Sequence, residues 1–261
     1  MKICKRPLAS FVVIFVLFAA FYIFWLSPRY TVPILMYHRF GYEKGSLFVS
    51  PENFARQMTY LKQNGYNVIS LRELAEGIRA NKRFKHNTVV ITIDDGYEDN
   101  YKYAYPILKR YNFTATIFIA VNSIGNNKDF LRWDEVMLML RDKITFGAHT
   151  KNNVYLPSIT NDRALWDEIG GAKKLIEENI GTSVDYFCYP TGGFTEETKE
   201  MVKKAGYKAA CTTNRGFADF NKDLYELKRV KVTNSDGNKP LSFWAKLTGY
   251  YNLFRTKKKG H

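Results

Sequence analysis

Two adjacent carboxylates follow a short apolar run and are the first candidates for chemistry. The run TVVITI (88–93) leads directly into Asp94, Asp95 and Gly96. Each carboxylate raises the pKa of its neighbour and resists burial, and a cation beside the pair would remove that cost. Gly96 permits a sharp turn, which would allow both side chains to face one cleft. The pair predicts a metal-dependent site, and an ordinary acidic turn is the alternative.

Two of the four histidines also end apolar runs. His38 closes VPILMYH (32–38), and His149 closes ITFGAH (144–149). Imidazole is a common ligand of transition metals, whereas the amide oxygen of Asn153, four residues after His149, is a poorer one. Each histidine alone could be an ordinary polar residue at a strand end. Together with the carboxylate pair they favour a mononuclear metal hydrolase site with an open position for water and a spare carboxylate as base.

The elements that must position these residues alternate along the chain between residues 31 and 233. Apolar strands that alternate with helices are typical of a parallel sheet covered on its outside by helices. About seven strands in roughly 200 residues predict an α/β fold, a distorted (β/α) barrel, in which ligands meet the loops at the carboxyl ends of the strands. The predicted strands are 32–38, 88–93, 114–120, 144–149, 184–189, 208–213 and 227–232. The predicted helices are 51–64, 71–80, 98–111, 133–141, 161–179 and 195–205.

Several of these helices have recognisable ends. Ser50 followed by Pro51 resembles an N-cap and a first helical turn, and Gly65 resembles a C-terminal stop. Asn161 and Thr195 are predicted N-caps of the same kind.

The composition excludes several classes of protein. The chain has 261 residues, of which 46% are hydrophobic, so it can bury a core and is not disordered. Three cysteines are too few for a small disulfide-stapled domain, and Cys188 and Cys211 would either pair or remain as buried thiols. Much of the net charge of +14 lies at the ends: residues 1–30 hold four basic residues and no acid, and residues 234–261 hold six basic residues and one acid. If the domain is exported, this distribution disfavours nucleic acid as a partner.

The N-terminus carries a long apolar run without charge. Residues 8–26 read LASFVVIFVLFAAFYIFWL, and as a helix they would extend about 28 Å, close to the roughly 30 Å of bilayer hydrocarbon. Three basic residues precede the run, which predicts a cytoplasmic N-terminus and an extracellular remainder. A cleaved signal peptide is the alternative, but its apolar core is shorter and ends in small residues. We therefore predict one transmembrane helix and a single-pass cell-membrane protein.

At these residues the sequence resembles the polysaccharide deacetylases with a NodB-homology domain, carbohydrate esterase family four. ITIDDGYEDN is similar to the family's T-F-D-D-G motif, with Ile93 in place of Phe, and FGAHTKNN is similar to its H-[ST]-x-x-H motif. FCYPTGGF resembles the third motif, around R-x-P-Y-G, and GYKAACTTNRG resembles the strand that follows. The opening VPILMYHRFG is similar to the branch that includes the extracellular poly-N-acetylglucosamine deacetylases. The similarity covers residues 31–233 in the expected order.

The resemblance implies a role for each candidate side chain. Asp94 would be the catalytic base, and His38 would be the general acid for the leaving amine. Asp95 and His149 would bind one divalent metal ion, commonly Zn²⁺, with Co²⁺ or Ni²⁺ as alternatives. Asn153 stands where the family has its second metal-binding histidine, and the change from imidazole to amide should weaken metal binding.

The resemblance also implies contacts with the substrate. A backbone N–H near Tyr189 would stabilise the oxyanion, and Pro190 and Tyr97 would lie beside the substrate. Tyr97 would either stack on a sugar ring or belong to a core stripe with Tyr101, four residues later. Cys188 stands where the third motif has an arginine that positions the base, a departure that the poly-N-acetylglucosamine branch tends to share. LKRVKVTNSDG has no counterpart of the family's C-terminal Leu-His motif.

These expectations combine into one hypothesis. The chain would consist of a cytoplasmic stub and transmembrane anchor (1–28), a catalytic domain (31–233) and a basic aromatic tail (234–261). The tail would be either a helix at the membrane interface or a solvated basic end. The protein would be a membrane-anchored extracytoplasmic enzyme that removes N-acetyl groups from a cell-wall or matrix polysaccharide. The rivals are a deacetylase-like domain that binds glycan without turnover, and an O-acetyl esterase acting on a wall polymer.

Overall fold

The strands form one parallel sheet that curls into a barrel. The computed structural model describes residues 6–27, 30–213 and 223–251. Eight strands follow one another in the order β10-β9-β8-β7-β6-β5-β1-β11, and β4 (Asn67–Val68) pairs with the start of β5. The eight strands are β1 (Ile34–Tyr37), β5 (Thr88–Ile93), β6 (Ala115–Ile119), β7 (Ile144–Ala148), β8 (Tyr186–Cys188), β9 (Ala209–Thr212), β10 (Leu227–Lys228) and β11 (Val230–Lys231). The predicted parallel α/β barrel is confirmed. A separate two-stranded ladder joins β2 (Arg39–Phe40) and β3 (Phe48–Val49).

A single residue separates the two edge strands of this sheet. β10 ends at Lys228 and β11 begins at Val230, yet β10 pairs with β9 whereas β11 pairs with β1. The chain therefore passes from one edge of the sheet to the other within one residue and closes the barrel. Arg229 lies at this seam. The sequence predicts one strand over 227–232, and the structure divides it because its two halves have different neighbours.

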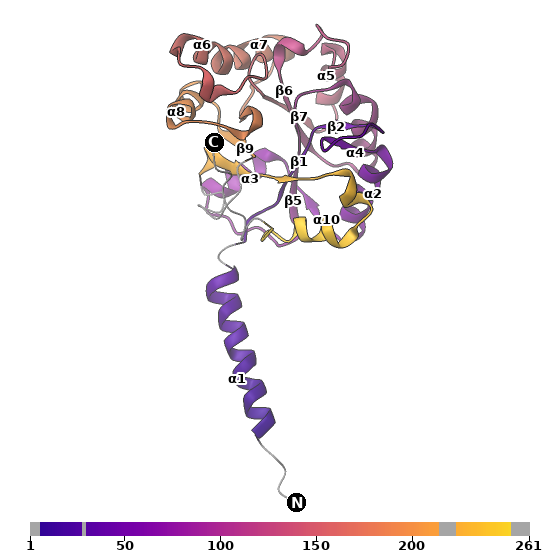
Figure 1. Cartoon of the computed structure of the whole chain (residues 1–261), viewed down its shortest axis with the longest axis vertical. Helices are drawn as coiled ribbons and strands as arrows, with labels where there is room; N and C mark the ends of the chain where they lie inside the picture. The colour runs from indigo at the N-terminus through magenta and orange to yellow at the C-terminus, as the bar shows by residue number, and fades with distance from the viewer. Residues whose placement is uncertain (1–5, 28–29, 214–222, 252–261) are drawn as a thin grey trace, which may run out of the picture.

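Helices surround the barrel on its outside (Figure 1). They are α2 (Pro51–Gln63), α3 (Leu71–Arg79), α4 (Tyr105–Tyr111), α5 (Trp133–Leu140), α6 (Asp162–Trp166), α7 (Ala172–Ile180) and α8 (Glu196–Lys204). The predicted caps are confirmed, because the side chains of Ser50, Asn161 and Thr195 each accept a backbone N–H from the first turn of the helix that follows. Two predicted helices contain π-helical turns: η3 (Asn100–Ala104) precedes α4, and η6 (Asp167–Gly171) joins α6 to α7.

The alternation along β5 shows how the core is divided. Ile91 and Ile93 belong to the large apolar cluster that the surrounding helices share. Val90 belongs to a second cluster, which includes inward-facing residues of β1, β6, β8 and β9. Because side chains alternate along a strand, Thr92 and Asp94 continue the inner row of Val90. Asp94 therefore points into the mouth of the barrel.

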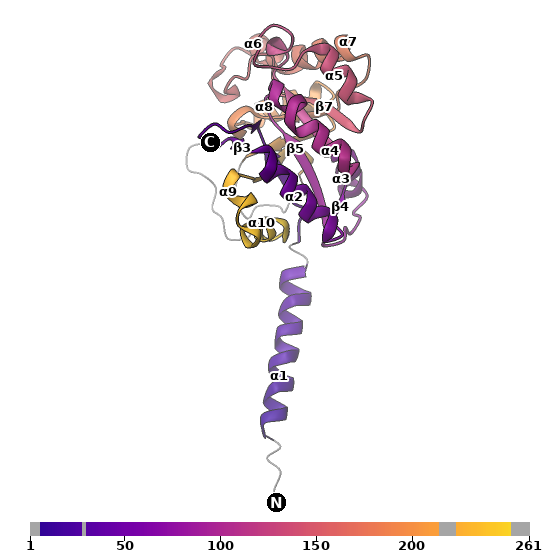
Figure 2. The ribbon, with the colours of Figure 1, turned by 90° about the vertical axis from the view of Figure 1, so that its right-hand side faces the viewer.

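The N-terminal apolar run does not form one long α-helix. α1 (Arg6–Ala20) has 15 residues, and the next six, η1 (Phe21–Leu26), have π-helical hydrogen bonding. At 1.5 Å per residue α1 extends about 22 Å, less than the roughly 30 Å of bilayer hydrocarbon. Among the residues described, no helix combines the length and the apolar character needed to cross a membrane. The predicted transmembrane helix, and the cell-membrane localisation that depended on it, are therefore wrong. α1 extends away from the barrel in both perpendicular views (Figures 1 and 2).

The first part of the predicted tail packs on the barrel. It forms α9 (Asn234–Gly237) and α10 (Pro240–Leu247). Phe243 and Leu247 of α10 are buried, and Phe243 meets Tyr60 of α2 edge to face at 5.7 Å. Nζ of Lys246 donates to the buried carboxylate of Asp236 at 2.5 Å. α10 is therefore held by the barrel, whereas the basic residues 252–261 lie outside the described residues. The proposed division into three regions stays a prediction.

Candidate active site

A cleft of about 440 Å³ opens at the carboxyl ends of the strands. His38 follows β1, Asp94 and Asp95 follow β5, His149 follows β7 and Thr213 follows β9, and all five line the cleft. In a parallel barrel the carboxyl ends of all strands meet at one rim, which brings together residues far apart in sequence. The structure therefore places the predicted carboxylate pair and both predicted histidines in one cleft.

An arginine outside the predicted site residues holds Asp94. Nη1 of Arg229 donates to Oδ1 of Asp94 and Nη2 donates to Oδ2, both at 2.6 Å. Both side chains are buried. Burial alone would raise the pKa of Asp94, but the Arg229 guanidinium outweighs burial and lowers this pKa to about 2. Asp94 is therefore ionised and fixed in orientation at neutral pH.

Arg229 supplies the guanidinium that the third motif lacks. Cys188 stands in the motif position of the family's arginine, and its Sγ lies 3.0 Å from Nη2 of Arg229 and 3.9 Å from each Asp94 oxygen. Closure of the barrel thus brings an arginine to Asp94 from the junction of β10 and β11, whereas Cys188 lies in β8. Cys188 and Cys211 are buried free thiols. The only signal in the sequence was an arginine within LKRVKV, a predicted strand whose three basic residues suggest solvent exposure.

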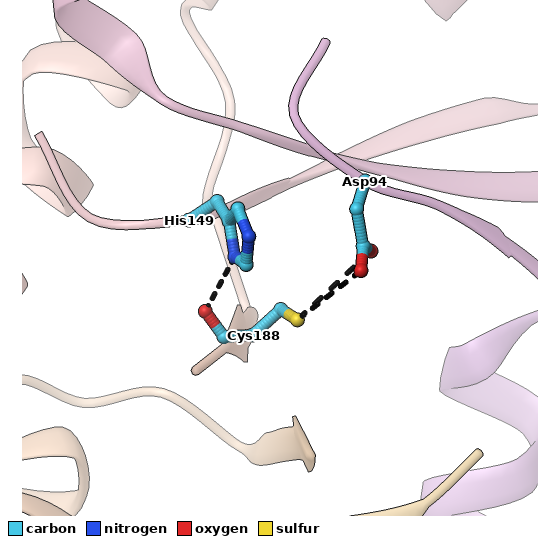
Figure 3. A group of neighbouring side chains, drawn as sticks. All are labelled: Asp94, His149 and Cys188. Carbon is cyan, nitrogen blue, oxygen red and sulfur yellow. Dashed lines mark hydrogen bonds between the residues drawn. The ribbon is translucent and has the colours of Figure 1, made fainter. Parts of the chain in front are cut away.

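The orientation of His149 is set by a backbone carbonyl. Its Nδ1 lies 2.7 Å from the carbonyl oxygen of Cys188 (Figure 3). Because a carbonyl can only accept, Nδ1 carries a proton, and this leaves Nε2 as the ring atom that could bind a metal ion. This Nε2 lies 3.5 Å from Oδ1 of Asp95. Nε2 and the carboxylate are therefore close enough to share a bound cation. Metal-binding histidines are commonly oriented by such a carbonyl.

Asn153 approaches the same carboxylate from the turn after β7. Its Nδ2 donates to Oδ1 of Asp95 at 3.0 Å, and a half-turn of the amide would present its oxygen there instead. The φ angles of Asp95, Thr150 and Asn153 are +75°, +62° and +56°. Residues other than glycine rarely adopt this region, and such strain gathers at functional sites. Gly96, at +81°, provides the predicted turn. The backbone is therefore bent at the ends of both β5 and β7.

Two sets of side chains have ligand atoms suited to a metal ion. Asp94, His149 and Cys188 each offer one ligand atom, and these atoms lie within 4.8 Å of one another (Figure 3). However, a guanidinium already occupies both Asp94 oxygens, and burial raises the pKa of the Cys188 thiol well above its ordinary value. A metal ion binds the thiolate form of cysteine, and the raised pKa disfavours that form of Cys188. Asp95, His149 and Asn153 offer a carboxylate, an imidazole and an amide without these costs, so this set fits a divalent cation better.

His38 lies beside Asp94 in the cleft. Its Nε2 is 3.7 Å from Oδ2 of Asp94, and its side chain is 16% exposed. Burial lowers the pKa of His38 below its ordinary value of 6.5, although the carboxylates of Asp94 and Asp95 act in the opposite direction. The carbonyl oxygen of His38 accepts a hydrogen bond from Nδ2 of Asn100 at 2.9 Å, which fixes the backbone. A neutral imidazole therefore faces an ionised carboxylate at pH 7.

Tyr97 lines the cleft, and its ring already contacts two other side chains. Phe130 stacks on it with ring centroids 4.6 Å apart, and the guanidinium of Arg39 lies 4.0 Å from its centroid. These two contacts occupy part of the ring surface. Stacking of a sugar on Tyr97 stays a prediction.

Tyr189 and Pro190 lie behind the cleft surface. The N–H of Tyr189 donates to the carbonyl oxygen of Cys211 at 3.0 Å, and its ring is buried against Phe194. Pro190 is also buried and has no N–H. The next residue, Thr191, lines the cleft and has a φ of +55°. Of these three residues, Thr191 is the one that lines the cleft, and its backbone N–H takes no part in the hydrogen bond between Tyr189 and Cys211.

Comparison with known proteins agrees with this site. Residues 81–210 match the family model for polysaccharide deacetylase. The chain is 35% identical over 202 residues to the "Putative polysaccharide deacetylase YxkH" of Bacillus subtilis (strain 168), which covers 77% of this chain and 71% of that protein. It is 26% identical over 198 residues to the poly-beta-1,6-N-acetyl-D-glucosamine N-deacetylase of Staphylococcus aureus (strain MSSA476), covering 71% of this chain and 68% of the relative.

A solved structure shows the same fold. The Streptococcus pyogenes deacetylase PplD in complex with acetate superposes with a TM-score of 0.75 at 25% identity. The superposition covers 82% of this chain and 97% of that one. The family match over residues 81–210 includes the positions of Asp94, Asp95 and His149. The chain therefore belongs to the polysaccharide deacetylase family.

Proposed function

We propose that this protein is a metal-dependent hydrolase that removes N-acetyl groups from a polymer containing N-acetylglucosamine. The observation that carries the proposal is the 3.5 Å approach of Nε2 of His149 to the Asp95 carboxylate, beside an Asp94 that Arg229 keeps ionised. The name of the Staphylococcus aureus relative supports the choice of substrate. The acetate in the Streptococcus pyogenes structure is the small product that such a reaction would release.

Asp95, His149 and Asn153 would hold the cation. When bound, a divalent ion such as Zn²⁺ supplies Lewis-acid polarisation of the acetamide carbonyl and lowers the pKa of a water molecule. Co²⁺ and Ni²⁺ suit the same nitrogen and oxygen ligands. Because an amide oxygen replaces an imidazole, we expect Zn²⁺ to bind about 10–100-fold more weakly than in a variant with histidine at position 153, by analogy with the loss of a partner of a metal ligand.

Asp94 and His38 would carry the protons. Asp94 accepts a proton from the attacking water, and Arg229 aims the carboxylate while it does so. A carboxylate with a pKa of about 2 does not retain that proton, and the neutral His38 lies 3.7 Å away to take it. His38 then protonates the leaving amine as the C–N bond breaks. The water oxygen ends in acetate, so one water is consumed for each amine and acetate formed.

Thr191 would stabilise the oxyanion that develops on the acetamide oxygen. The expected backbone N–H near Tyr189 is not that of Tyr189 itself, because this group is paired with Cys211. Thr191 lies two residues further on and lines the cleft. Its N–H is therefore the candidate, and one preorganised donor of this kind contributes about 10²–10³ in rate.

The proposal is tested by incubating the protein and Zn²⁺ with β-1,6-linked N-acetylglucosamine oligomers and measuring acetate together with new primary amines. We expect equal amounts of both products. Asp94→Asn should reduce kcat by about 10²–10⁴, the range for a lost general base. The side chain of Asp142 is 31% exposed, does not line the cleft and pairs with Lys109 and Tyr105, so Asp142→Asn serves as a matched control and should keep wild-type activity.

The rival functions give different results in the same assay. A glycan-binding domain would retain the oligomers but release no acetate from either the wild type or Asp94→Asn. An O-acetyl esterase would release neither acetate nor new amines from these N-acetylated oligomers, although it would release acetate from an O-acetylated glycan. Either result would refute the proposed N-deacetylase activity.

A further inference from the structure

The turn that carries Asn153 depends on a carboxylate from a helix farther along the chain. The backbone N–H groups of Lys151 and Asn152 donate to Oε2 of Glu168 at 2.9 Å and 3.1 Å. Nδ2 of Asn152 donates to Oε1 of the same side chain at 2.5 Å. Glu168 is 9% exposed. One nearly buried carboxylate thus accepts three hydrogen bonds from two consecutive residues, and hydrogen bonds to an ionised acceptor are the strong ones.

The shape of this turn is unfavourable without support. Thr150 has a φ of +62°, which is a marked outlier for a β-branched residue, and Asn153 has a φ of +56°. Strained conformations persist only where surrounding structure imposes them. The two residues that Glu168 binds lie between these two strained positions. Glu168 therefore contacts the turn where support is needed.

The helix that presents Glu168 is itself irregular. Glu168 belongs to η6, a π-helical segment between α6 and α7. Single π-helical turns within α-helices occur often at functional sites. The neighbouring Asp167 points elsewhere, since it is 61% exposed and pairs with Nζ of Lys151 at 2.9 Å. Only one of the two adjacent acids therefore reaches the backbone of the turn.

We propose that Glu168 is a positioning residue of the active site. It fixes the turn over residues 150–153 and so holds the Asn153 amide against Asp95, 3.0 Å away. Glu168 does not line the cleft, and it acts only through the turn. The inference rests on the proposed function, because that function gives the Asn153 amide a part in binding the cation.

The test replaces Glu168 by glutamine. Glutamine keeps the size of the side chain but offers one acceptor oxygen, so it cannot serve both the backbone of the turn and the Asn152 side chain. Asp167→Asn removes the same charge from the adjacent residue and is the matched control. Three quantities are measured: hydrogen exchange at the N–H groups of Lys151 and Asn152 without metal, the NMR resonances of the Asn153 side-chain amide, and the Zn²⁺ dissociation constant by calorimetry.

We expect Glu168→Gln to accelerate exchange at both N–H groups by about tenfold or more, to move the Asn153 resonances, and to weaken Zn²⁺ binding about tenfold. Asp167→Asn should leave all three close to wild type. Should Glu168→Gln not fold, Glu168→Asp, which keeps the charge on a shorter stem, is measured in the same way. No change in Glu168→Gln, or equal changes in both variants, would overturn the positioning role.

Failure of the proposed function has a different signature. Absence of Zn²⁺ binding to the wild type would refute the metal-dependent part of that function. The exchange rates and the Asn153 resonances are measured without metal and would still decide the role of Glu168.

Discussion

Replacement of Arg229 by glutamine should destabilise the protein and shift the acid limb of its activity. The guanidinium makes two 2.6 Å hydrogen bonds to Asp94 in a buried place. Without it, burial would raise the pKa of Asp94, since desolvation is the largest single influence on this carboxylate. A rise in the pKa of Asp94 from about 2 to its ordinary value of 3.8 would alone lower the free energy of unfolding at pH 7 by about 2.4 kcal/mol. Removal of one partner from a buried ion pair generally costs about 3–5 kcal/mol, which is the loss we expect at pH 7.

The sign of the pH dependence follows from the lowered pKa. In the wild type, the Asp94–Arg229 contribution to stability is present above about pH 4 and is lost as the pH falls toward 2. In Arg229→Gln the Asp94 carboxylate takes up its proton at higher pH. The stability deficit should therefore shrink on acidification, and the acid limb of kcat/KM should move to higher pH.

The assays are urea unfolding at several pH values and kcat/KM from pH 4 to 8. Arg229→Lys keeps the charge but loses the bidentate contact with Asp94. Its free energy of unfolding and its acid limb should therefore lie between those of the wild type and Arg229→Gln. Arg132→Gln, which changes an arginine that is 61% exposed, is the matched control. The double variant Asp94→Asn/Arg229→Gln should lose less stability than the sum of the single variants. A loss below 1 kcal/mol in Arg229→Gln, with an unchanged acid limb, would refute the assignment of Arg229 as the partner of Asp94.

Three further outcomes are expected. Because His38 enters the reaction neutral, kcat/KM should rise with pH below pH 6.5 and stay level from there to pH 8. A decrease in kcat/KM between pH 6.5 and 8 that is absent from His38→Gln would contradict this role. Asn153→His should tighten Zn²⁺ binding about 10–100-fold, as measured by calorimetry, and unchanged affinity would mean that position 153 does not contact the metal. Lys246→Met, which leaves the buried Asp236 carboxylate unpaired, should lower the free energy of unfolding at pH 7 by about 3–5 kcal/mol. Lys246 lowers the pKa of Asp236 against the effect of burial, so this deficit should shrink as the pH falls below about 4; a deficit independent of pH would exclude this cause.

Local patterns predicted the regular part of the fold well. TVVITI is a strand over the expected residues 88–93, because six consecutive apolar or β-branched residues suit a strand buried on both faces. Ser50 caps α2 as its side-chain chemistry predicts. The predicted helix 161–179 is instead interrupted by the π-helical turn η6, which hydrophobic periodicity does not distinguish from an α-helix. The same limit applies at Phe21, where the change to π-helical hydrogen bonding ends α1 and makes the predicted transmembrane helix wrong.

Only those residues of the candidate site that stand at the ends of predicted strands could be predicted from the sequence. His38, Asp94 and His149 meet because the carboxyl ends of parallel strands share one rim. Arg229 was missed because closure of the barrel, which is a long-range event, turns a residue of a short charged strand into a buried partner. Glu168 was missed for a similar reason, since its contact with the turn after β7 depends on how α6 and η6 pack.

Diffraction from crystals soaked in Zn²⁺, measured at the zinc absorption edge, would test the metal assignment most directly. We expect one strong anomalous peak within ligand distance of Nε2 of His149 and a carboxylate oxygen of Asp95, with the Asn153 amide turned to present its oxygen. The Asp94–Arg229 contact should remain intact beside it. A peak among Asp94, His149 and Cys188, or no peak in the cleft, would contradict the assignment.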